Sequence, residues 1–338
     1  MRSTLAAQHA VAAPAYPLET ALSATGLRPR PGLLMIDRMY QPRRPFKSEF
    51  IPVRGLRYHL LSWGEPTPGR PPLVLLHGWM DVAASWQFVV DAFAEDRHVI
   101  APDWRGFGLT ACGVDHYIMG DYMADLDCLL DHVAGDTAVD LVGHSMGGNV
   151  SMLYAGVRPQ RIRRLVNLEG FGMPPAEAEE APARYGKWID ELKRLHRGEL
   201  DLKAYPAIDG VARRLMKTNP RLAADKAQWL AGHWARQRAD GLWEILGEAG
   251  HKISSAQVYR LDEVLALYRR ISAPLLAVEA SDDSLAGWWK GRYTLDQYHE
   301  RLQSVRDARV ARVEDAGHML HHDQPERVAT LIEAHLAA

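Results

Sequence analysis

One serine in this sequence stands in a setting that favours nucleophilic catalysis. Ser145 lies in the segment GHSMGG (143–148), directly after the apolar run VDLVGH and directly before the helix-like segment NVSMLYAGV. A G-x-S-x-G motif between a strand and a helix forms a sharp turn that exposes the serine, and the small flanking residues let the backbone close up. We therefore predict that Ser145 is a nucleophile.

A serine hydroxyl is a weak nucleophile until a base takes its proton. The candidate base is His318, which follows a glycine just after the apolar run RVARV and so falls on a loop at the carboxyl edge of a sheet. His321 and His322 come one turn further on. No matching acidic or cysteine ligand set accompanies these histidines, so we expect His321 and His322 to be solvated or helix-capping, and we predict no metal site.

The imidazole needs a carboxylate that fixes its tautomer and stabilises the imidazolium. Our choice is Asp283, on the loop after the run PLLAVEA, because it lies one residue further onto that loop than Asp282. It also gives the chain order serine, acid, histidine that a nucleophile elbow favours. Glu169, at the end of the run RLVNLE, is the alternative acid, and Asp282 is the third choice.

The negatively charged oxygen of a tetrahedral intermediate needs backbone N–H donors. One donor is expected to be the amide of Met146, directly after the nucleophile. The second is expected from the loop after the run LVLLH, where Gly78 lets the backbone approach and the amide of Trp79 is available. The Trp79 side chain would form a pocket wall or pack in the core.

Short apolar runs and helix-length segments alternate along the chain, and the candidate residues follow the runs. Fully apolar strands separated by helices indicate a mostly parallel sheet covered on both faces. A predicted antiparallel hairpin around Arg54-Gly55 makes the sheet mixed. We therefore predict an α/β fold with a mostly parallel, mixed eight-stranded sheet. The remaining predicted strands are 73–77, 98–102, 139–144, 164–169, 275–280 and 309–313, and the predicted helices are 83–94, 118–134, 146–158, 294–305 and 325–336.

The alternation is interrupted once, over residues 172–270, where helical patterns occur without a strand-like run. We predict that this segment is a helical cap, or lid, over the carboxyl edge of the sheet, where ligands bind in open α/β sheets. The core domain would then comprise residues 47–171 and 271–338. Residues 1–46 are basic and rich in proline, and they predict a loosely ordered N-terminal arm, or a start that extends too far upstream.

Composition excludes several classes of protein. The 338 residues include 40 Lys and Arg against 42 Asp and Glu, a balance that argues against a nucleic-acid-binding protein. Two cysteines cannot form a disulfide framework or a multi-cysteine zinc site, and they fit a reducing compartment, the cytoplasm. No apolar run reaches the length of a membrane span. We expect a small-molecule substrate, no cofactor, no nucleic-acid partner and no membrane span, and the sequence carries no signal for an oligomeric state.

With these motifs in place, the chain resembles the α/β-hydrolase superfamily from about residue 48 to residue 338. The matching segments are HGWMDVAASW (77–86), PDWRGFGLT (102–110), GHSMGG (143–148), ASDDSL (280–285) and DAGHMLHHDQPE (315–326). Further segments look like the capped serine-hydrolase-like branch, which is related to epoxide hydrolases; these are NLEGFGMPP (167–175), HK (251–252) and YRLDEVLALYRRI (259–271). The resemblance implies a Ser-His-acid hydrolase with a helical cap. Epoxide hydrolases and haloalkane dehalogenases have aspartate where this chain has Ser145, which argues against both activities.

The leading functional hypothesis is hydrolysis of carboxylic esters of small to medium apolar or aromatic substrates through an acyl-enzyme. The same triad supports hydrolysis of a carbon–carbon bond in a diketone-type substrate, and this is the alternative. A third hypothesis, from another class, is a small-molecule receptor with weak turnover. Tryptophans and methionines in the predicted cap suit an apolar pocket, but aromatic residues at helical spacing are more often cap packing, so no single cap residue is assigned to the substrate.

Overall fold

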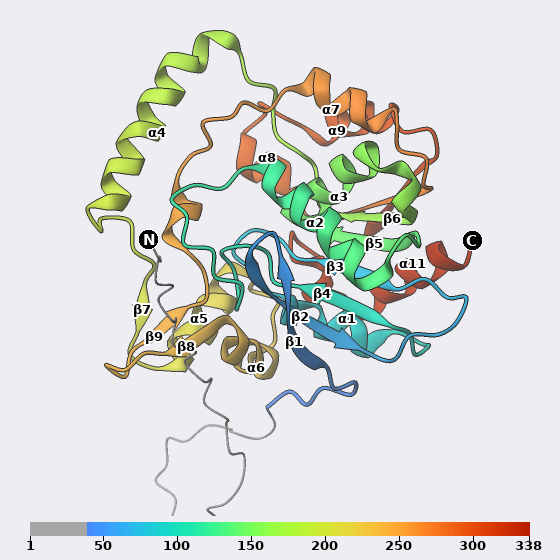
Figure 1. The fold of residues 1–338 in the computed structure, drawn as a ribbon, viewed down its shortest axis with the longest axis horizontal. Coiled ribbons are helices and arrows are strands. Elements are labelled where there is room, and N and C mark those ends of the chain that lie inside the picture. The colour runs from blue at the N-terminus through green and yellow to red at the C-terminus, as the bar shows by residue number, and fades with distance from the viewer. Residues whose placement is uncertain (1–38) are drawn as a thin grey trace, which may run out of the picture. The chain divides into compact units, whose positions relative to one another are not determined.

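The computed structural model describes residues 39–338, which form a central eight-stranded sheet (Figure 1). The strand order is β1-β2-β4-β3-β5-β6-β10-β11. β2 pairs antiparallel with β1 and β4, and every other neighbouring pair is parallel. The prediction of an α/β fold with a mostly parallel, mixed eight-stranded sheet is confirmed. The strands are β1 (Lys47–Val53), β2 (Leu56–Trp63), β3 (Leu73–Leu76), β4 (Val99–Pro102), β5 (Val139–His144), β6 (Ile162–Leu168), β10 (Leu275–Ala280) and β11 (Ala308–Val313).

Both faces of the sheet are covered, as a fully apolar strand requires. The four residues of β3 are all buried, and alternate side chains enter opposite core clusters, Leu73 and Leu75 in one and Val74 and Leu76 in the other. Side chains of α1 (Gln87–Ala92) and α11 (Pro325–Ala337) pack in the first cluster. The second cluster contains side chains of α2 (Met119–Ala134), α3 (Met146–Val157) and α9 (Leu295–Leu302). Between residues 39 and 338, no helix combines the length and the apolar character needed to cross a bilayer.

The segment predicted as a cap contains helices and also a small sheet. Its order β7-β9-β8 contradicts our expectation of no strand in this region. These strands are two or three residues long, too short to show a periodic pattern in the sequence. The elements are η3 (Ala178–Glu180), α4 (Ala181–His196), β7 (Ala204–Tyr205), α5 (Ile208–Thr218), α6 (Ala224–Trp234), β8 (Ala235–Gln237), β9 (Trp243–Ile245), η4 (Ala249–Lys252) and α7 (Leu261–Tyr268).

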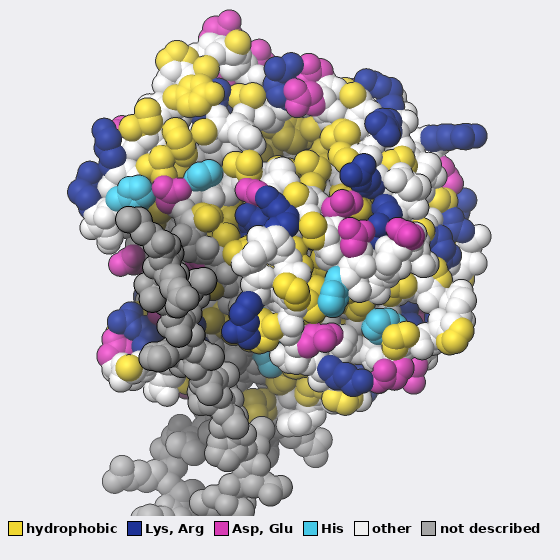
Figure 2. All heavy atoms as spheres, viewed as in Figure 1, with side chains coloured by type: hydrophobic (Ala, Val, Ile, Leu, Met, Phe, Trp, Pro, Cys, Tyr) yellow, Lys and Arg dark blue, Asp and Glu magenta, His cyan; other side chains and the backbone are white. Residues whose placement is uncertain are grey.

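Two helices of this segment differ in their packing. Side chains Val264 and Tyr268 of α7 belong to the same core cluster as α3, so α7 packs with α3. By contrast, no residue of α4 is buried. Figure 2 shows apolar side chains gathered over α4, at the upper left, and Tyr185 and Ile189 of this helix are nearly half exposed.

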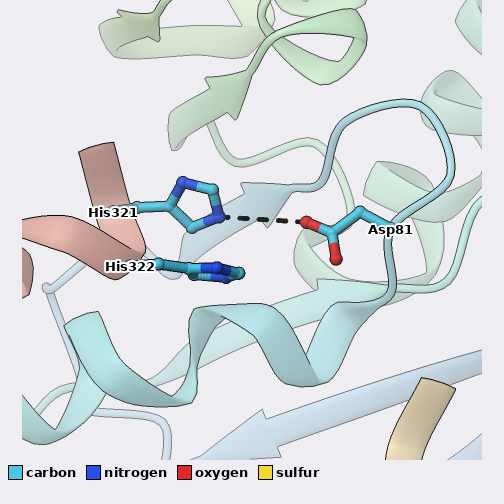
Figure 3. A group of neighbouring side chains, drawn as sticks. All are labelled: Asp81, His321 and His322. Carbon is cyan, nitrogen blue, oxygen red and sulfur yellow. Dashed lines mark ion pairs between the residues drawn. The ribbon is translucent and has the colours of Figure 1, made fainter. Parts of the chain in front are cut away.

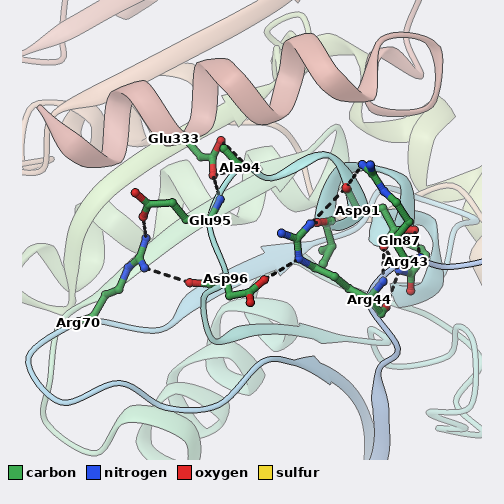
Figure 4. Close-up of polar contacts among 10 residues, drawn as sticks. Arg43, Arg44, Arg70, Gln87, Asp91, Ala94, Glu95, Asp96 and Glu333 are labelled. Carbon is green, nitrogen blue, oxygen red and sulfur yellow. Dashed lines mark hydrogen bonds and ion pairs between the residues drawn. The ribbon is translucent and has the colours of Figure 1, made fainter.

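Of the arm predicted over residues 1–46, the described part is its last stretch, and residues 1–38 lie outside the described chain. The carboxylate of Asp91, in α1, accepts the backbone N–H groups of Arg43 at 2.9 Å and Arg44 at 2.7 Å (Figure 4). These bonds fix the backbone just before β1. The hairpin β1–β2 then follows, with Arg54 and Gly55 at its turn, as the sequence predicted.

Candidate active site

The turn that carries Ser145 joins β5 to α3. Ser145 has φ 53° and ψ −114°, outside the regions that non-glycine residues favour. Its N–H donates to the carbonyl of Leu168, at the end of the neighbouring strand β6, at 2.8 Å. A conformation of this kind costs about 1–3 kcal/mol and persists only where the surroundings enforce it. The strained strand-to-helix turn expected from the motif is therefore present.

Two glycines allow this turn to close. A Cβ atom on Gly147 would lie 2.6 Å from the carbonyl oxygen of His77 and closer still to that of Leu76. A Cβ atom on Gly143 would lie 2.5 Å from the hydroxyl of Ser151. Both distances are far below van der Waals contact, so a side chain at Gly147 would push α3 away from the end of β3, and one at Gly143 would push α3 away from β5.

His318 faces the serine from the loop between β11 and α10 (Leu320–Asp323). Its Nε2 lies 2.9 Å from the Ser145 hydroxyl oxygen. The ring of Trp288 packs edge-to-face on the imidazole, with ring centroids 4.4 Å apart. Burial lowers the pKa of His318 to about 4, which keeps the imidazole neutral at pH 7 and able to accept the serine proton.

The carboxylate beside His318 belongs to Glu169. Its Oε2 lies 3.2 Å from Nδ1 of the imidazole, on the side opposite the serine. Oε1 accepts the N–H of Ala280 at 2.7 Å, and Oε2 accepts the hydroxyl of Ser284 at 2.8 Å, so both oxygens are held in place. Burial raises the pKa of Glu169 to about 7, and these two hydrogen bonds oppose that rise.

Asp283, our first choice of acid, does not lie beside the base, so this choice was wrong. The Asp283 carboxylate accepts the N–H of Ala286 at 2.9 Å and caps the start of α8 (Ser284–Trp289). Asp282 forms an ion pair with Arg221 at 2.7 Å. The alternative residue, Glu169, occupies the position, and the chain order serine, acid, histidine is unchanged.

The predicted oxyanion donors stand on two adjacent backbone segments. Met146 is the first residue of α3, and the first N–H groups of a helix have no acceptor within it. Gly78 lies against the nucleophile, since a Cβ atom there would be 3.1 Å from the Cβ atom of Ser145. The next amide is that of Trp79, whose side chain is 55% exposed and therefore does not pack in the core.

A residue that the sequence did not indicate supports the loop of the base. His144, directly before the nucleophile, is buried, and its Nε2 lies 2.7 Å from the carbonyl oxygen of His318. Burial lowers the pKa of His144 to about 3, so the ring is neutral and Nε2 donates to this carbonyl. No motif separates this histidine from any other residue at the end of a buried strand.

The two histidines after His318 do not behave as expected. We expected solvated or helix-capping residues, but His321 is fully buried and His322 is 4% exposed. The short helix α10 turns both rings inward, where His321 packs on Trp86 with ring centroids 5.0 Å apart. The carboxylate of Asp81 lies beside them, and one ligand atom from each of the three residues falls within 4.8 Å of the others (Figure 3). An acidic partner therefore exists, from a distant part of the chain.

The eight-stranded sheet, the strained serine turn and the facing histidine together define an α/β hydrolase. The family model for the alpha/beta hydrolase fold matches residues 71–325, and the chain belongs to this family.

The chain is similar to two curated proteins and to one solved structure. The chain is 26% identical over 291 residues to a serine hydrolase-like protein from Danio rerio, covering 84% of this chain and 87% of that protein. It is 34% identical over 140 residues to a 2-hydroxymuconate semialdehyde hydrolase from Pseudomonas sp. strain CF600, covering 40% of this chain and 48% of the relative. Among solved structures, the thioesterase domain from the curacin biosynthetic pathway shares the fold, with a TM-score of 0.72, 24% identity, and coverage of 86% of this chain and 99% of the domain.

Proposed function

We propose that this α/β hydrolase is a serine esterase that cleaves carboxylic esters of small to medium apolar or aromatic substrates. The observation that carries the proposal is the line of three side chains at the serine turn. The Ser145 hydroxyl lies 2.9 Å from His318 Nε2, and His318 Nδ1 lies 3.2 Å from Glu169. This is the arrangement that activates a serine for attack on a carbonyl carbon.

The reaction would run in two halves. Ser145 Oγ attacks the ester carbonyl while His318 takes its proton, and the amides of Trp79 and Met146 donate to the oxyanion. The C–O bond of the ester then breaks, and His318 gives its proton to the departing alkoxide. The alcohol departs, and Ser145 remains as an acyl-enzyme. Water repeats the attack, with His318 again taking and returning the proton, and releases the carboxylic acid. Glu169 stabilises the imidazolium that forms in each half.

Exposed aromatic side chains next to the triad support an apolar substrate. Trp79 is 55% exposed and follows Gly78 at the nucleophile, and Trp288 is 50% exposed and contacts the His318 ring. Large aromatic surfaces of this kind suit an apolar or aromatic acyl group better than a charged one.

The test replaces the nucleophile. We expect Ser145→Ala to lower kcat on p-nitrophenyl esters roughly a millionfold, as removal of a triad serine does. A fluorophosphonate probe should label the wild type and fail to label this variant. Ser272→Ala is the matched control, because Ser272 is exposed and bonds only to the carbonyl of Pro159. A loss of less than a hundredfold would refute the assignment of Ser145.

Hydrolysis of carbon–carbon bonds is the second candidate. The similarity to 2-hydroxymuconate semialdehyde hydrolase, which spans about half of that relative, supports it. A panel of p-nitrophenyl esters of graded chain length should be compared with a ring-fission diketone. Higher kcat/KM on the diketone would assign carbon–carbon hydrolysis. Tight binding with negligible turnover on every substrate would instead assign a small-molecule receptor.

We further propose that the enzyme works in a reducing compartment, the cytoplasm. Cys112 and Cys128 are both free, and Cys128 is exposed. A disulfide-forming environment would leave such a thiol open to oxidation.

A further inference from the structure

A second group of polar side chains lies buried next to the triad. It consists of Asp81, in the loop after β3, and His321 and His322, in α10 (Figure 3). Their exposed fractions are 3%, 0% and 4%. We call these three residues the Asp-His-His cluster. Two imidazoles and a carboxylate are the donor types with which proteins hold divalent transition metals.

The potential ligand atoms of the cluster form no hydrogen bonds with the described residues. Oδ2 of Asp81 and all four ring nitrogens of His321 and His322 are buried without a hydrogen-bond partner in residues 39–338. Burying a polar atom without a partner is unfavourable, and native proteins rarely accept it. Such a group of atoms at one place points to a bound ion that takes one ligand atom from each residue.

The carboxylate is already oriented toward the rings. Oδ1 of Asp81 accepts the indole N–H of Trp234 at 3.1 Å and the hydroxyl of Ser85. These bonds leave Oδ2 directed at Nε2 of His321, 3.8 Å away. This separation is too long for a hydrogen bond, but it suits two ligands of one ion, because Zn–N and Zn–O bonds of about 2.0–2.2 Å hold their ligand atoms about 3–4 Å apart.

We propose that Asp81, His321 and His322 bind a divalent transition-metal ion of the zinc type. The ligand atoms lie within 4.8 Å of one another, so a shift of about 1 Å brings all three to bonding distance. Trp234 and Ser85 supply the outer hydrogen bonds that fix a ligating carboxylate.

The ion would connect two of the loops that form the candidate active site. Asp81 lies two residues after Trp79, the predicted oxyanion donor, and His321 lies three residues after His318. The rings of His321 and His144 are in contact, with centroids 4.2 Å apart, and His144 bonds to the carbonyl of His318. The ion would thus fix the position of the His318 loop relative to the Trp79 loop without touching the substrate.

The first experiment measures binding to the full chain. The protein is unfolded in denaturant that contains a chelator, refolded with or without Zn²⁺, and dialysed. Refolding is used because a buried site fills most readily during folding. We expect one zinc per chain, and a thermal midpoint about 4 °C higher at zinc concentrations a hundredfold above the Kd. Refolding with Co²⁺ should give visible absorption bands of nitrogen and oxygen ligation. A wild-type chain with no bound metal, no shift in midpoint and no cobalt bands would overturn the proposal.

Variants then locate the ion. His322→Gln and Asp81→Asn should each weaken zinc binding at least tenfold. The matched control is His116→Gln with His196→Gln, which removes two exposed histidines around Asp115 and should leave one zinc per chain. His318→Gln should also keep the ion, so loss of the triad and loss of the site are distinguishable. Unchanged binding in His322→Gln, or loss of the ion in His318→Gln, would contradict the assignment. If His322→Gln fails to fold, the cobalt spectrum of the wild type decides.

Discussion

The candidate triad and the Asp-His-His cluster are neighbours that share the segment from His318 to His322, yet their polar atoms differ in hydrogen bonding. In the triad, both ring nitrogens of His318 and both oxygens of Glu169 have partners at hydrogen-bond distance. In the cluster, none of the four ring nitrogens has one among residues 39–338. A chain of paired groups can pass a proton along its hydrogen bonds, whereas unpaired, buried nitrogen and oxygen atoms leave lone pairs available for the cation that we propose there. Histidines three residues apart can therefore serve different chemistry.

Replacing the acid of the triad separates its two candidate acids. Glu169→Gln keeps the size of the side chain but removes the charge that stabilises the imidazolium, so kcat should fall about 10⁴-fold. Asp283→Asn is the matched control, because Asp283 only caps α8, and its kcat should change less than threefold. Steady-state kinetics on one p-nitrophenyl ester measures both. The reverse ranking would restore Asp283 as the acid.

A substitution where the two regions meet should disturb both of them. Gly147→Ala places a methyl group against the carbonyls of Leu76 and His77, at the start of the loop that carries Trp79 and Asp81. Because backbone atoms cannot yield as a side chain can, we expect a loss of about 3 kcal/mol in the free energy of unfolding. Denaturant unfolding by circular dichroism checks this.

The control for that substitution is Gly186→Ala. Gly186 lies inside α4, and an added Cβ atom there would have no neighbour within 4 Å. Alanine is the better helix former, so this variant should be as stable as the wild type or up to about 1 kcal/mol more stable. Equal destabilisation by the two substitutions would show that the close approach at Gly147 does not matter.

The smallest expected effect concerns His251, a buried imidazole outside both regions, and the pH dependence of the free energy of unfolding. His251 is stacked between Phe107 and Tyr117, and burial lowers its pKa to about 3. Between pH 7 and pH 5 the unfolded chain therefore binds a proton at His251 that the folded chain does not bind. Stability rises with pH wherever the unfolded state binds more protons, so acidification destabilises the fold.

Removing this group should make the response to acid weaker. Lowering the pH from 7 to 5 should cost the wild type about 2 kcal/mol more than it costs His251→Gln, since the unfolded pKa is near 6.5. Urea unfolding of both proteins at the two pH values gives the comparison. Parallel pH profiles would mean that His251 is protonated within the fold.

Much of the site could be predicted because its signals are local. The motif around Ser145 contains the glycines that its turn requires, and the apolar runs before it and before His318 indicate strands that end at the same edge of the sheet. The acid could not be ranked correctly in the same way. Asp283 and Glu169 both follow a strand, and the choice depends on competing hydrogen bonds, since Asp283 caps a helix while Glu169 turns back toward the base.

The short strands β7, β8 and β9 and the burial of His321 and His322 were missed for a related reason. A strand of two or three residues has no period to detect, and it exists because its partners lie alongside. The histidines of α10 look like surface residues in a polar stretch, DAGHMLHHDQPE, until α1 and the loop of Asp81 are placed against them.

The amino-acid order alone indicated the alternating architecture, the candidate nucleophile and the candidate base, because periodicity and turn chemistry act over a few neighbouring residues. The partner of the base and the grouping of Asp81 with His321 and His322 were decided only in three dimensions. Those pairings join residues 149 and 240 positions apart in the chain, and no short-range preference reports which distant side chain will fill a given space.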